Sequence, residues 1–320
     1  MTALGEDPSN LFSYAVVLLF VMTVVLIYVL AGAVLLRAVI RRLGRTPKPS
    51  ILDHALLRRT CLALAAAGTL CIAYGRWIEP FRIEVSHVRI PSAKLKPGDS
   101  LRILHISDTH CDGWGPNEAR LLEIAREEYP DLIVFTGDSC NNPGPGAAAF
   151  RRLVGSLQAS SGCYAVRGNW DVWFWNLIDL FGDTGWRELD GHVTTDVRGT
   201  PVAVCGAPYG GDYRSALAGL PPEAFTLFLY HTPDLVREPE LQTADLYCAG
   251  HTHGGQVCLP GWGALVTFSR YGKAYESGLY GVGKCALYVC RGLGMEGGAA
   301  PRVRFWCRPE AALIEVVPLH

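Results

Sequence analysis

The sequence has no strong overall charge, because 29 basic residues offset 30 acidic residues and leave a net charge of −1 at pH 7. Nucleic-acid-binding surfaces need an excess of Lys and Arg, so this balance does not favour nucleic acid as a partner. The chain also has no internal repeat and no low-complexity tract, so nothing in it indicates a repeat architecture. No feature of the sequence identifies a protein partner.

Cys-x-x-Cys pairs are missing, although the chain contains 11 cysteines. Two cysteines lie in an apolar segment near the N-terminus, and the nine that follow are an odd number. Several of these nine, such as Cys205, Cys248, Cys285 and Cys290, lie within apolar runs. We therefore expect buried free thiols rather than a disulfide framework, which favours a reducing compartment for this part of the chain.

Charged residues are absent from the 29 residues between Pro8 and Leu36. About 20 apolar residues cross a bilayer, so this run predicts a transmembrane helix. A cleaved signal peptide does not fit, because the run is too long and its basic residues follow it. A second uncharged run of 16 residues, Thr60 to Gly75, is near the lower length limit for spanning. It spans the membrane, lies at the interface or packs on the first helix.

The loop between these two runs has seven basic residues and one acidic residue, Asp53. The positive-inside tendency places this loop in the cytoplasm. The rest of the chain is then extracytoplasmic if the second run spans and cytoplasmic if it does not. We predict a membrane anchor at 1–76 (helix 8–36, basic loop 37–59, second apolar segment 60–75) in the inner cell membrane. The lipid bilayer is its partner, and the face of the remaining chain stays open.

The chain beyond the anchor is typical of an α/β protein. We predict a connector at 77–100 and a domain at 101–320, with an edge strand at 82–85 entering the domain. Helices are predicted at 116–128 and 147–158. Further strands are predicted at 101–107, 132–136, 162–166, 202–205, 226–230, 246–248, 286–290, 302–306 and 313–317.

Side chains that bind metals follow five of these predicted strands. In open α/β sheets such side chains gather at the carboxyl ends of strands, and core packing does not produce this pattern. Carboxylate, imidazole and amide donors without Cys suit Mn²⁺, with Fe or Zn²⁺ as alternatives, and two adjacent ions suit phosphoester cleavage. The donors are Asp108 and His110, Asp138, Asn169, His231, and His251 with His253.

The last two donors lie in a glycine-rich loop. His residues two apart in an extended chain point in opposite directions, so a turn must bring His251 and His253 to the same side. Gly250, Gly254 and Gly255 supply the backbone freedom for that turn.

These motifs, in this order, resemble the calcineurin-like metallophosphoesterases. Within that family the chain is similar to the membrane-associated bacterial branch that includes UDP-2,3-diacylglucosamine hydrolase-like phosphodiesterases. The resemblance covers about residues 100 to 317. The matching segments are Ile106-Ser107-Asp108-Thr109-His110, Thr136-Gly137-Asp138, Arg167-Gly168-Asn169-Trp170-Asp171, Tyr230-His231-Thr232-Pro233-Asp234, Gly250-His251-Thr252-His253-Gly254-Gly255-Gln256 and Arg291-Gly292-Leu293-Gly294.

The resemblance implies an α/β fold, a four-layer α/β/β/α sandwich, with two divalent metal ions at one sheet edge. By position, Asp108, His110 and His253 hold one ion and Asn169, His231 and His251 hold the other. Asp138 bridges them, and Asp138 and Asn169 act as catalytic residues. A hydroxide that bridges the ions then attacks phosphorus in line.

One position departs from the family pattern, which commonly reads Gly-Asn-His-Asp in the third motif. Trp170 replaces that His and cannot donate a proton to a leaving group, so the general acid is not assigned. Substitution by Trp favours activated diesters or pyrophosphates over alkyl monoesters. Arg167, Trp170 and Arg291 are candidate substrate-binding residues.

The sequence therefore predicts a membrane-anchored enzyme that hydrolyses a phosphodiester or pyrophosphate bond. A nucleotide-lipid such as UDP-2,3-diacylglucosamine, a precursor of lipid A, is the first substrate candidate. The alternatives are an extracytoplasmic phosphodiesterase with another substrate and an inactive membrane scaffold. Because all seven donor positions are filled, the sequence argues against the scaffold.

Overall fold

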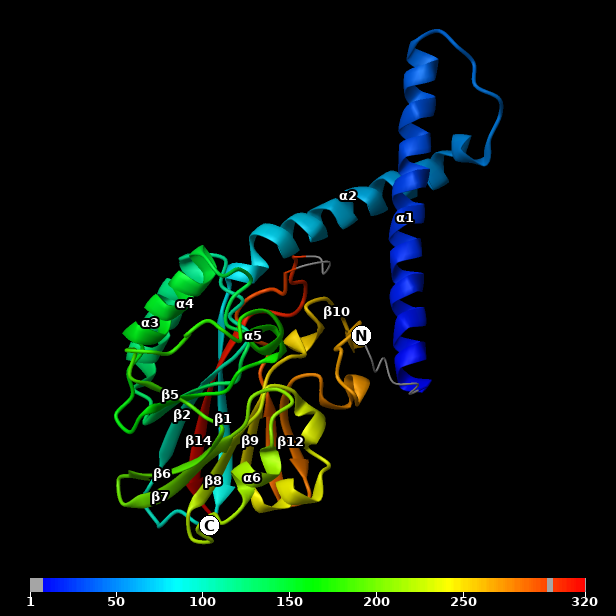
Figure 1. The fold of residues 1–320 in the computed structure, drawn as a ribbon. Helices are drawn as coiled ribbons and strands as arrows, with labels where there is room; N and C mark the ends of the chain where they lie inside the picture. Colours follow the sequence, from blue (N-terminus) through cyan, green and yellow to red (C-terminus); the bar gives the residue numbers. More distant parts are fainter. Residues whose placement is uncertain (1–7, 298–301, 320) are drawn as a thin grey trace. The chain divides into compact units, whose positions relative to one another are not determined.

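The computed structural model describes residues 8–297 and 302–319. The chain divides into two compact units, Met1–Ile78 and Glu79–His320, which we describe separately (Figure 1).

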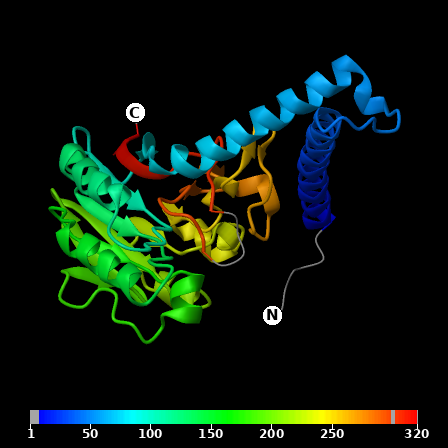
Figure 2. The same ribbon diagram turned by 90° about the horizontal axis from the view of Figure 1, so that it is seen from above.

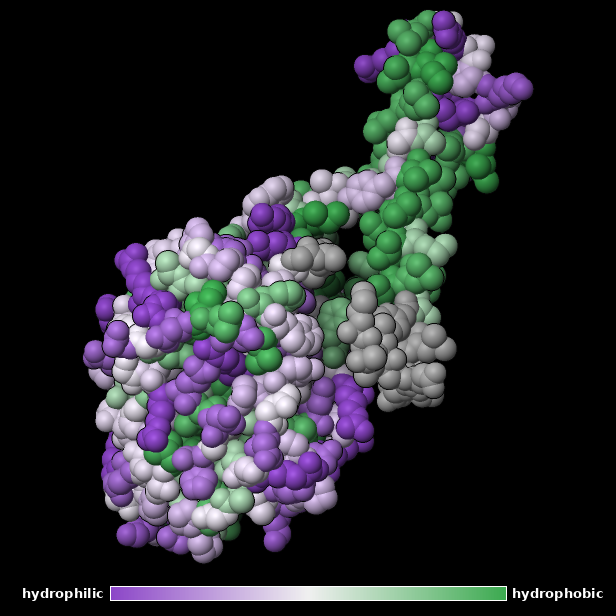
Figure 3. Space-filling view, viewed as in Figure 1, coloured by the Kyte–Doolittle hydropathy of each residue, from purple (hydrophilic) through white to green (hydrophobic). Residues whose placement is uncertain are grey.

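The N-terminal unit is a pair of helices, α1 (Pro8–Arg42) and α2 (Ala55–Trp77), joined through a short 3₁₀ helix, Ile51–Asp53. By length and composition, both helices are long and apolar enough to cross a membrane. Figure 3 shows that apolar residues cover α1 along most of its length. The helices contact each other where the hydroxyl of Tyr28 lies 2.9 Å from that of Thr69. The second helix, α2, extends beyond both ends of the 16-residue uncharged run predicted from the sequence.

The basic loop between the helices is anchored by its one acidic residue. The guanidinium of Arg37 donates to both carboxylate oxygens of Asp53, at 2.9 and 2.7 Å, and Arg41 also pairs with this carboxylate. Asp53 in turn accepts a hydrogen bond from the backbone N–H of Ser50, the residue that caps the 3₁₀ helix. Asp53 thus ties the end of α1 to the 3₁₀ helix and offsets part of the positive charge of the loop.

The second unit contains two six-stranded sheets. The first has the order β1 (Glu84–Ser92), β14 (Glu310–Pro318), β2 (Leu101–Ile106), β3 (Leu132–Phe135), β4 (Cys163–Ala165) and β5 (Trp186–Glu188). The second has the order β12 (Gly278–Val282), β13 (Cys285–Val289), β9 (Leu246–Ala249), β8 (Phe225–Leu229), β7 (Thr200–Gly206) and β6 (Gly191–Val197). Strands β2 to β5 are parallel, as are β7, β8, β9 and β13. A two-stranded ribbon joins β10 (Cys258–Leu259) to β11 (Gly263–Ala264).

Helices cover the outer faces of both sheets, as Figures 1 and 2 show. The first sheet carries α3 (Pro116–Glu128) and α4 (Pro145–Ser156). The second carries α6 (Tyr213–Leu217) and 3₁₀ helices at Pro233–Leu235 and Pro239–Thr243. The remaining short helices are α5 (Asn169–Phe174) and 3₁₀ turns at Glu79–Phe81, His253–Gly255 and Gly272–Tyr275.

Three apolar clusters lie between the successive layers, so the fold is the expected α/β/β/α sandwich. Strand β2 shows how the pattern arises. Leu101 and Ile103 lie in the cluster between the sheets, whereas Leu104 and Ile106 lie in the cluster under the helices. Side chains alternate between the two faces of a strand, so a strand buried on both faces is mostly apolar, and in β2 the exceptions are Arg102 and His105.

Several segments differ from the sequence prediction, which also missed β5, β6 and β12. The predicted strand 302–306 is wrong: among its residues only Phe305 makes a β-bridge, to Val257. In this segment the fully buried guanidinium of Arg304 donates to the carbonyls of Arg291 and Gly294. The predicted connector contains β1, an edge strand that pairs along its nine residues with β14.

Candidate metal centre

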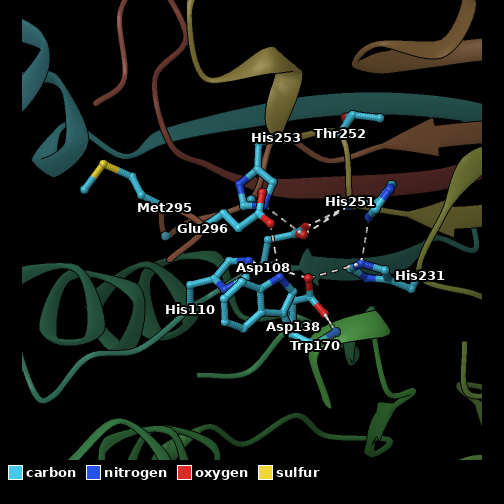
Figure 4. Close-up of polar contacts among 12 residues, drawn as sticks. Asp108, His110, Asp138, Trp170, His231, His251, Thr252, His253, Met295 and Glu296 are labelled. Atoms are coloured by element: carbon cyan, nitrogen blue, oxygen red, sulfur yellow. Dashed lines mark hydrogen bonds and ion pairs between the residues drawn. The ribbon is translucent and has the colours of Figure 1, made fainter. Parts of the chain in front are cut away.

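The seven predicted donors lie together where five parallel strands end. In the first sheet β2, β3 and β4 end at Ile106, Phe135 and Ala165, and in the second β8 and β9 end at Leu229 and Ala249. Because both sheets direct these carboxyl ends to one edge, donors far apart in the chain meet there, as Figure 4 shows.

Asp138 is the carboxylate that contacts both groups of histidines. Its Oδ2 lies 3.5 Å from Nε2 of His110 and 3.3 Å from Nε2 of His231. On one side, His253 Nε2 lies 3.4 Å from Oδ1 of Asp108. On the other, His251 Nδ1 lies 3.2 Å from Nε2 of His231.

The backbone at the donors is unusual. Asp108, His110, Asp138, His251 and His253 all have positive φ angles, between 39° and 69°. Residues with a side chain rarely adopt this conformation, which costs free energy and is concentrated at functional sites. The surrounding structure holds it in place, since the N–H of Asp108 donates to Gly137 O at 2.9 Å and that of His110 to Asp138 O at 3.1 Å.

Two buried polar atoms in the cluster have no hydrogen-bond partner among the described residues: His110 Nε2 and Asn169 Oδ1. Such atoms are costly in a protein interior unless a ligand satisfies them. Two groups of three side chains bring their donor atoms within 4.8 Å of one another, namely Asp108 with His110 and His253, and Asp108 with Asp138 and His231. The residues therefore fit a divalent metal ion.

Hydrogen bonds also set the protonation of two of the imidazoles. The Nδ1–H of His231 donates to the Thr136 carbonyl at 2.7 Å, and that of His110 donates to Oδ1 of Asn141 at 3.0 Å. In the neutral form of both rings the Nε2 lone pair is then directed at the cluster, and this is the form that binds a metal.

The buried carboxylates of Asp108 and Asp138 lie close together, so positive charge between them would stabilise their ionised forms. Burial raises the pKa of Asp108 to about 7. Burial also raises the pKa of Asp138, but the charges of His231 and the other imidazoles prevail and lower it to about 2. The Asp138 carboxylate in turn overcomes the effect of burial on His231 and raises the pKa of that imidazole to about 9. Divalent ions would bring more positive charge to these two carboxylates than the single imidazolium of His231 does.

Two supporting residues were not assigned by the sequence reasoning. The Asp171 carboxylate is fully buried and accepts from the backbone N–H groups of Asp138, Ser139 and Gly168 at 2.8–3.0 Å, which fixes the loop that carries Asp138. Asn141 binds the ring of His110 and also its carbonyl, at 2.9 Å. Asp171 lies in the third motif, whereas nothing near Asn141 in the sequence indicates its role.

Replacing Asn141 by Ala is expected to lower metal affinity and phosphodiesterase activity by about 10–100-fold, as for other groups that orient a metal-bound histidine. The reason is that His110 loses the acceptor that fixes its ring orientation. Metal content and kcat/KM measure the effect. The matched control is Asn176→Ala at an exposed position, where unchanged values are expected. Equal loss in both variants would contradict this role for Asn141.

A cavity of about 270 Å³ opens onto the donors. Trp170 lies on its wall, and its backbone N–H donates to Oδ1 of Asp138 at 2.9 Å. Its indole N–H donates to Oε1 of Glu296 at 3.3 Å. The lining residues are Asp138, Asn169, Trp170, Trp173, Tyr209, His251, His253, Phe268 and Glu296.

The two predicted arginines are not among these lining residues. Arg167 pairs with Glu188 at 2.5 Å and donates to the carbonyls of Trp175 and Ile178. Arg291 pairs with Glu310 and Glu84, at 3.2 Å each. Both guanidinium groups thus bind structural partners in this conformation, and Trp170 is the one predicted substrate-binding residue at the cavity.

His105 and the cysteines behave as structural groups, as predicted. Nε2 of His105 lies 2.9 Å from the hydroxyl of Thr136, and burial lowers the pKa of its ring to about 3. None of the 11 cysteines is in a disulfide, and Cys205, Cys248, Cys285 and Cys290 are buried.

Comparison with known proteins agrees with this geometry. The calcineurin-like phosphoesterase family matches residues 101–255. The uncharacterized metallophosphoesterase YkuE of Bacillus subtilis is 33% identical over 267 residues, which cover 78% of this chain and 90% of YkuE.

Two further relatives have named activities. UDP-2,3-diacylglucosamine pyrophosphatase LpxG of Chlamydia muridarum is 25% identical over 79% of this chain and 94% of its own length. Phosphodiesterase YaeI of Escherichia coli is 28% identical over 75% of this chain and 89% of its own length. With its metal-binding geometry and these relatives, the chain belongs to the calcineurin-like phosphoesterases and is a metal-dependent phosphoester hydrolase.

Proposed function

We propose that this protein is a membrane-anchored phosphoesterase with two metal ions that hydrolyses a phosphodiester or pyrophosphate bond. The observation that carries the proposal is the position of the Asp138 carboxylate between Nε2 of His110 and Nε2 of His231. A carboxylate with an imidazole on each side suits a bridge between two ions, here most suitably Mn²⁺, with Fe or Zn²⁺ as alternatives.

Each side chain has a defined task in this proposal. Asp108, His110 and His253 hold one ion, and Asn169, His231 and His251 hold the other. Two ions bound there would lower the pKa of a water molecule and neutralise charge on the phosphoryl oxygens. Asp138 and Asn169 contribute by fixing the ion positions on the cavity wall, where the reacting phosphorus must lie.

The anchor supports a substrate in or near a membrane. Both helices of the N-terminal unit have the length and composition to span, and the inner cell membrane is the proposed location. If both span, the N-terminus and the catalytic unit face the same side, and the positively charged loop lies opposite, in the cytoplasm. A reporter fused at the C-terminus distinguishes the two faces, since an extracytoplasmic signal would exclude a UDP-linked substrate, which is cytoplasmic.

UDP-2,3-diacylglucosamine is the first candidate substrate because the LpxG relative is named for it. The cavity itself favours a second candidate, a phosphodiester without a diphosphate. No Lys or Arg is among the described residues that line it, so a second phosphate group would have no protein cation there.

The test uses the full-length protein in detergent, stripped of metal by a chelator and then supplied with Mn²⁺. We expect the stripped protein to be inactive and Mn²⁺ to restore hydrolysis of bis(p-nitrophenyl) phosphate. UDP-2,3-diacylglucosamine is assayed beside it, and p-nitrophenyl phosphate is expected to react more slowly than the diester. A protein that binds Mn²⁺ but turns over none of the three would be a membrane scaffold and not an enzyme.

A further inference from the structure

We propose that the cavity selects a phosphodiester carrying an ammonium group, primary or quaternary, close to the phosphorus, and that Glu296 with Trp170 recognises this cation. The inference rests on the proposed phosphodiesterase function and adds the substrate class. A headgroup of the ethanolamine or choline type has the required chemistry.

The cavity has an acidic side chain that is available to bind a cation. Among the described lining residues, Glu296 is the one charged residue that is not a predicted metal donor. Its carboxylate accepts from the indole of Trp170 and makes no ion pair with any Lys or Arg of the described residues. Burial raises the pKa of this carboxyl, so a cationic ligand would relieve an unfavourable environment for the carboxylate.

Asn141 holds the backbone on both sides of Glu296. Oδ1 of Asn141 accepts from the N–H of Gly297 at 3.1 Å, and its Nδ2 donates to the carbonyl of Met295 at 3.2 Å. The same amide binds the ring of His110. The position of the carboxylate is therefore coupled to the metal centre, and Figure 4 shows Glu296 on the side of the cluster that holds His110 and His253.

Aromatic side chains form much of the lining of the cavity. Trp170, Trp173, Tyr209 and Phe268 line the same small cavity. Aromatic rings attract ammonium groups through the negative charge of their faces, and sites that bind quaternary ammonium commonly combine several rings with an acid. An uncharged apolar substituent would gain from the rings but would leave the Glu296 carboxylate without a cationic partner.

The spacing fits a short linker between phosphate and cation. Trp170 donates its backbone N–H to Asp138 and its indole N–H to Glu296. One residue thus spans the distance from the proposed bridging carboxylate to the carboxylate that faces the cation. Trp170 is a positioning residue for Glu296, which accounts for Trp at the place where the family commonly has His.

The test compares two substrates that differ only in charge: p-nitrophenyl phosphorylcholine and its neutral carbon analogue, p-nitrophenyl 3,3-dimethylbutyl phosphate. The full-length protein is loaded with Mn²⁺ for both. We expect kcat/KM to favour the cationic substrate by at least about tenfold, within the range of a cation–aromatic contact and a charge-assisted bond. Glu296→Gln should abolish the preference, mainly by raising KM for the cationic substrate, and Glu296→Asp should retain part of it.

The neutral substrate checks the folding of each variant, because it has no charge for Glu296 to recognise and a folded Glu296→Gln protein should still hydrolyse it. The matched control is Glu123→Gln on the exposed face of α3, where both substrates should behave as in the wild type. Equal kcat/KM for the two substrates in the wild type would overturn the inference and leave the phosphodiesterase proposal intact. Equal loss of kcat for both in Glu296→Gln would overturn it in favour of proton donation. No hydrolysis of either would instead refute the phosphodiesterase itself.

Discussion

Replacing Asp138 by Asn is expected to lower kcat/KM for a phosphodiester by about 10³-fold, the scale of losing a central electrostatic group in an active site. Asn keeps the shape and can still accept the hydrogen bond from the N–H of Trp170. What it loses is the negative charge between His110 and His231. Without that charge the two proposed ions would have no shared anionic ligand, so binding of a second ion should weaken most.

The measurement combines kcat/KM for bis(p-nitrophenyl) phosphate at saturating Mn²⁺ with metal content per chain. The control is Asp190→Asn, an exposed Asp outside the cavity, for which wild-type values are expected. An Asp138→Asn protein that keeps two ions and wild-type turnover would exclude the bridging role.

Gly250→Ala is expected to reduce activity by about 10²-fold, because small displacements of catalytic groups have effects of this size. A Cβ at position 250 would lie 2.0 Å from Oγ of Ser107 and 2.2 Å from Oδ2 of Asp108. Both distances are far below van der Waals contact, so Ser107 and Asp108 or the backbone at position 250 must move. Asp108 is held by the N–H of His251, at 3.1 Å, so the carboxylate and the histidine loop must shift together.

The matched control for this change is Gly281→Ala in β12, where an added Cβ has no neighbour within 4 Å. Both substitutions replace glycine by alanine in the second unit, but only the first reaches a predicted metal ligand. Thermal unfolding with and without Mn²⁺ separates the causes, because loss of the Mn²⁺-dependent rise in Tm should accompany loss of activity. Similar activity in the two variants would show that the close packing at Gly250 does not position Asp108.

The ordered donors could be predicted because their signal is local. Each follows an apolar strand, and the carboxyl ends of parallel strands meet at one edge whatever the details of the loops. Asn141 and Glu296 have no such signal. Their roles depend on contacts between segments 31 and 126 residues apart, from Asn141 to His110 and from Glu296 to Trp170.

The strands differ in the same way in how far their sequences predict them. Strands buried on both faces, such as β3 and β8, are almost uniformly apolar and can be recognised in the sequence. The edge strand β6 alternates between exposed and half-buried residues and was not predicted. The segment around Arg304 resembles a strand because Val303 and Phe305 alternate with arginines, yet Arg304 is fully buried and only Phe305 makes a β-bridge.

The sequence by itself indicated the apolar N-terminal helices, the α/β class and the seven candidate donors, because each depends on residue type and short-range pattern. Only the tertiary structure decided that Asp138 lies between two groups of imidazoles, that Arg167 and Arg291 bind structural partners, and that Glu296 lies at the cavity. The physical reason is that charge pairing and burial depend on neighbours brought together by folding, and a buried charge keeps its place only where those neighbours satisfy it.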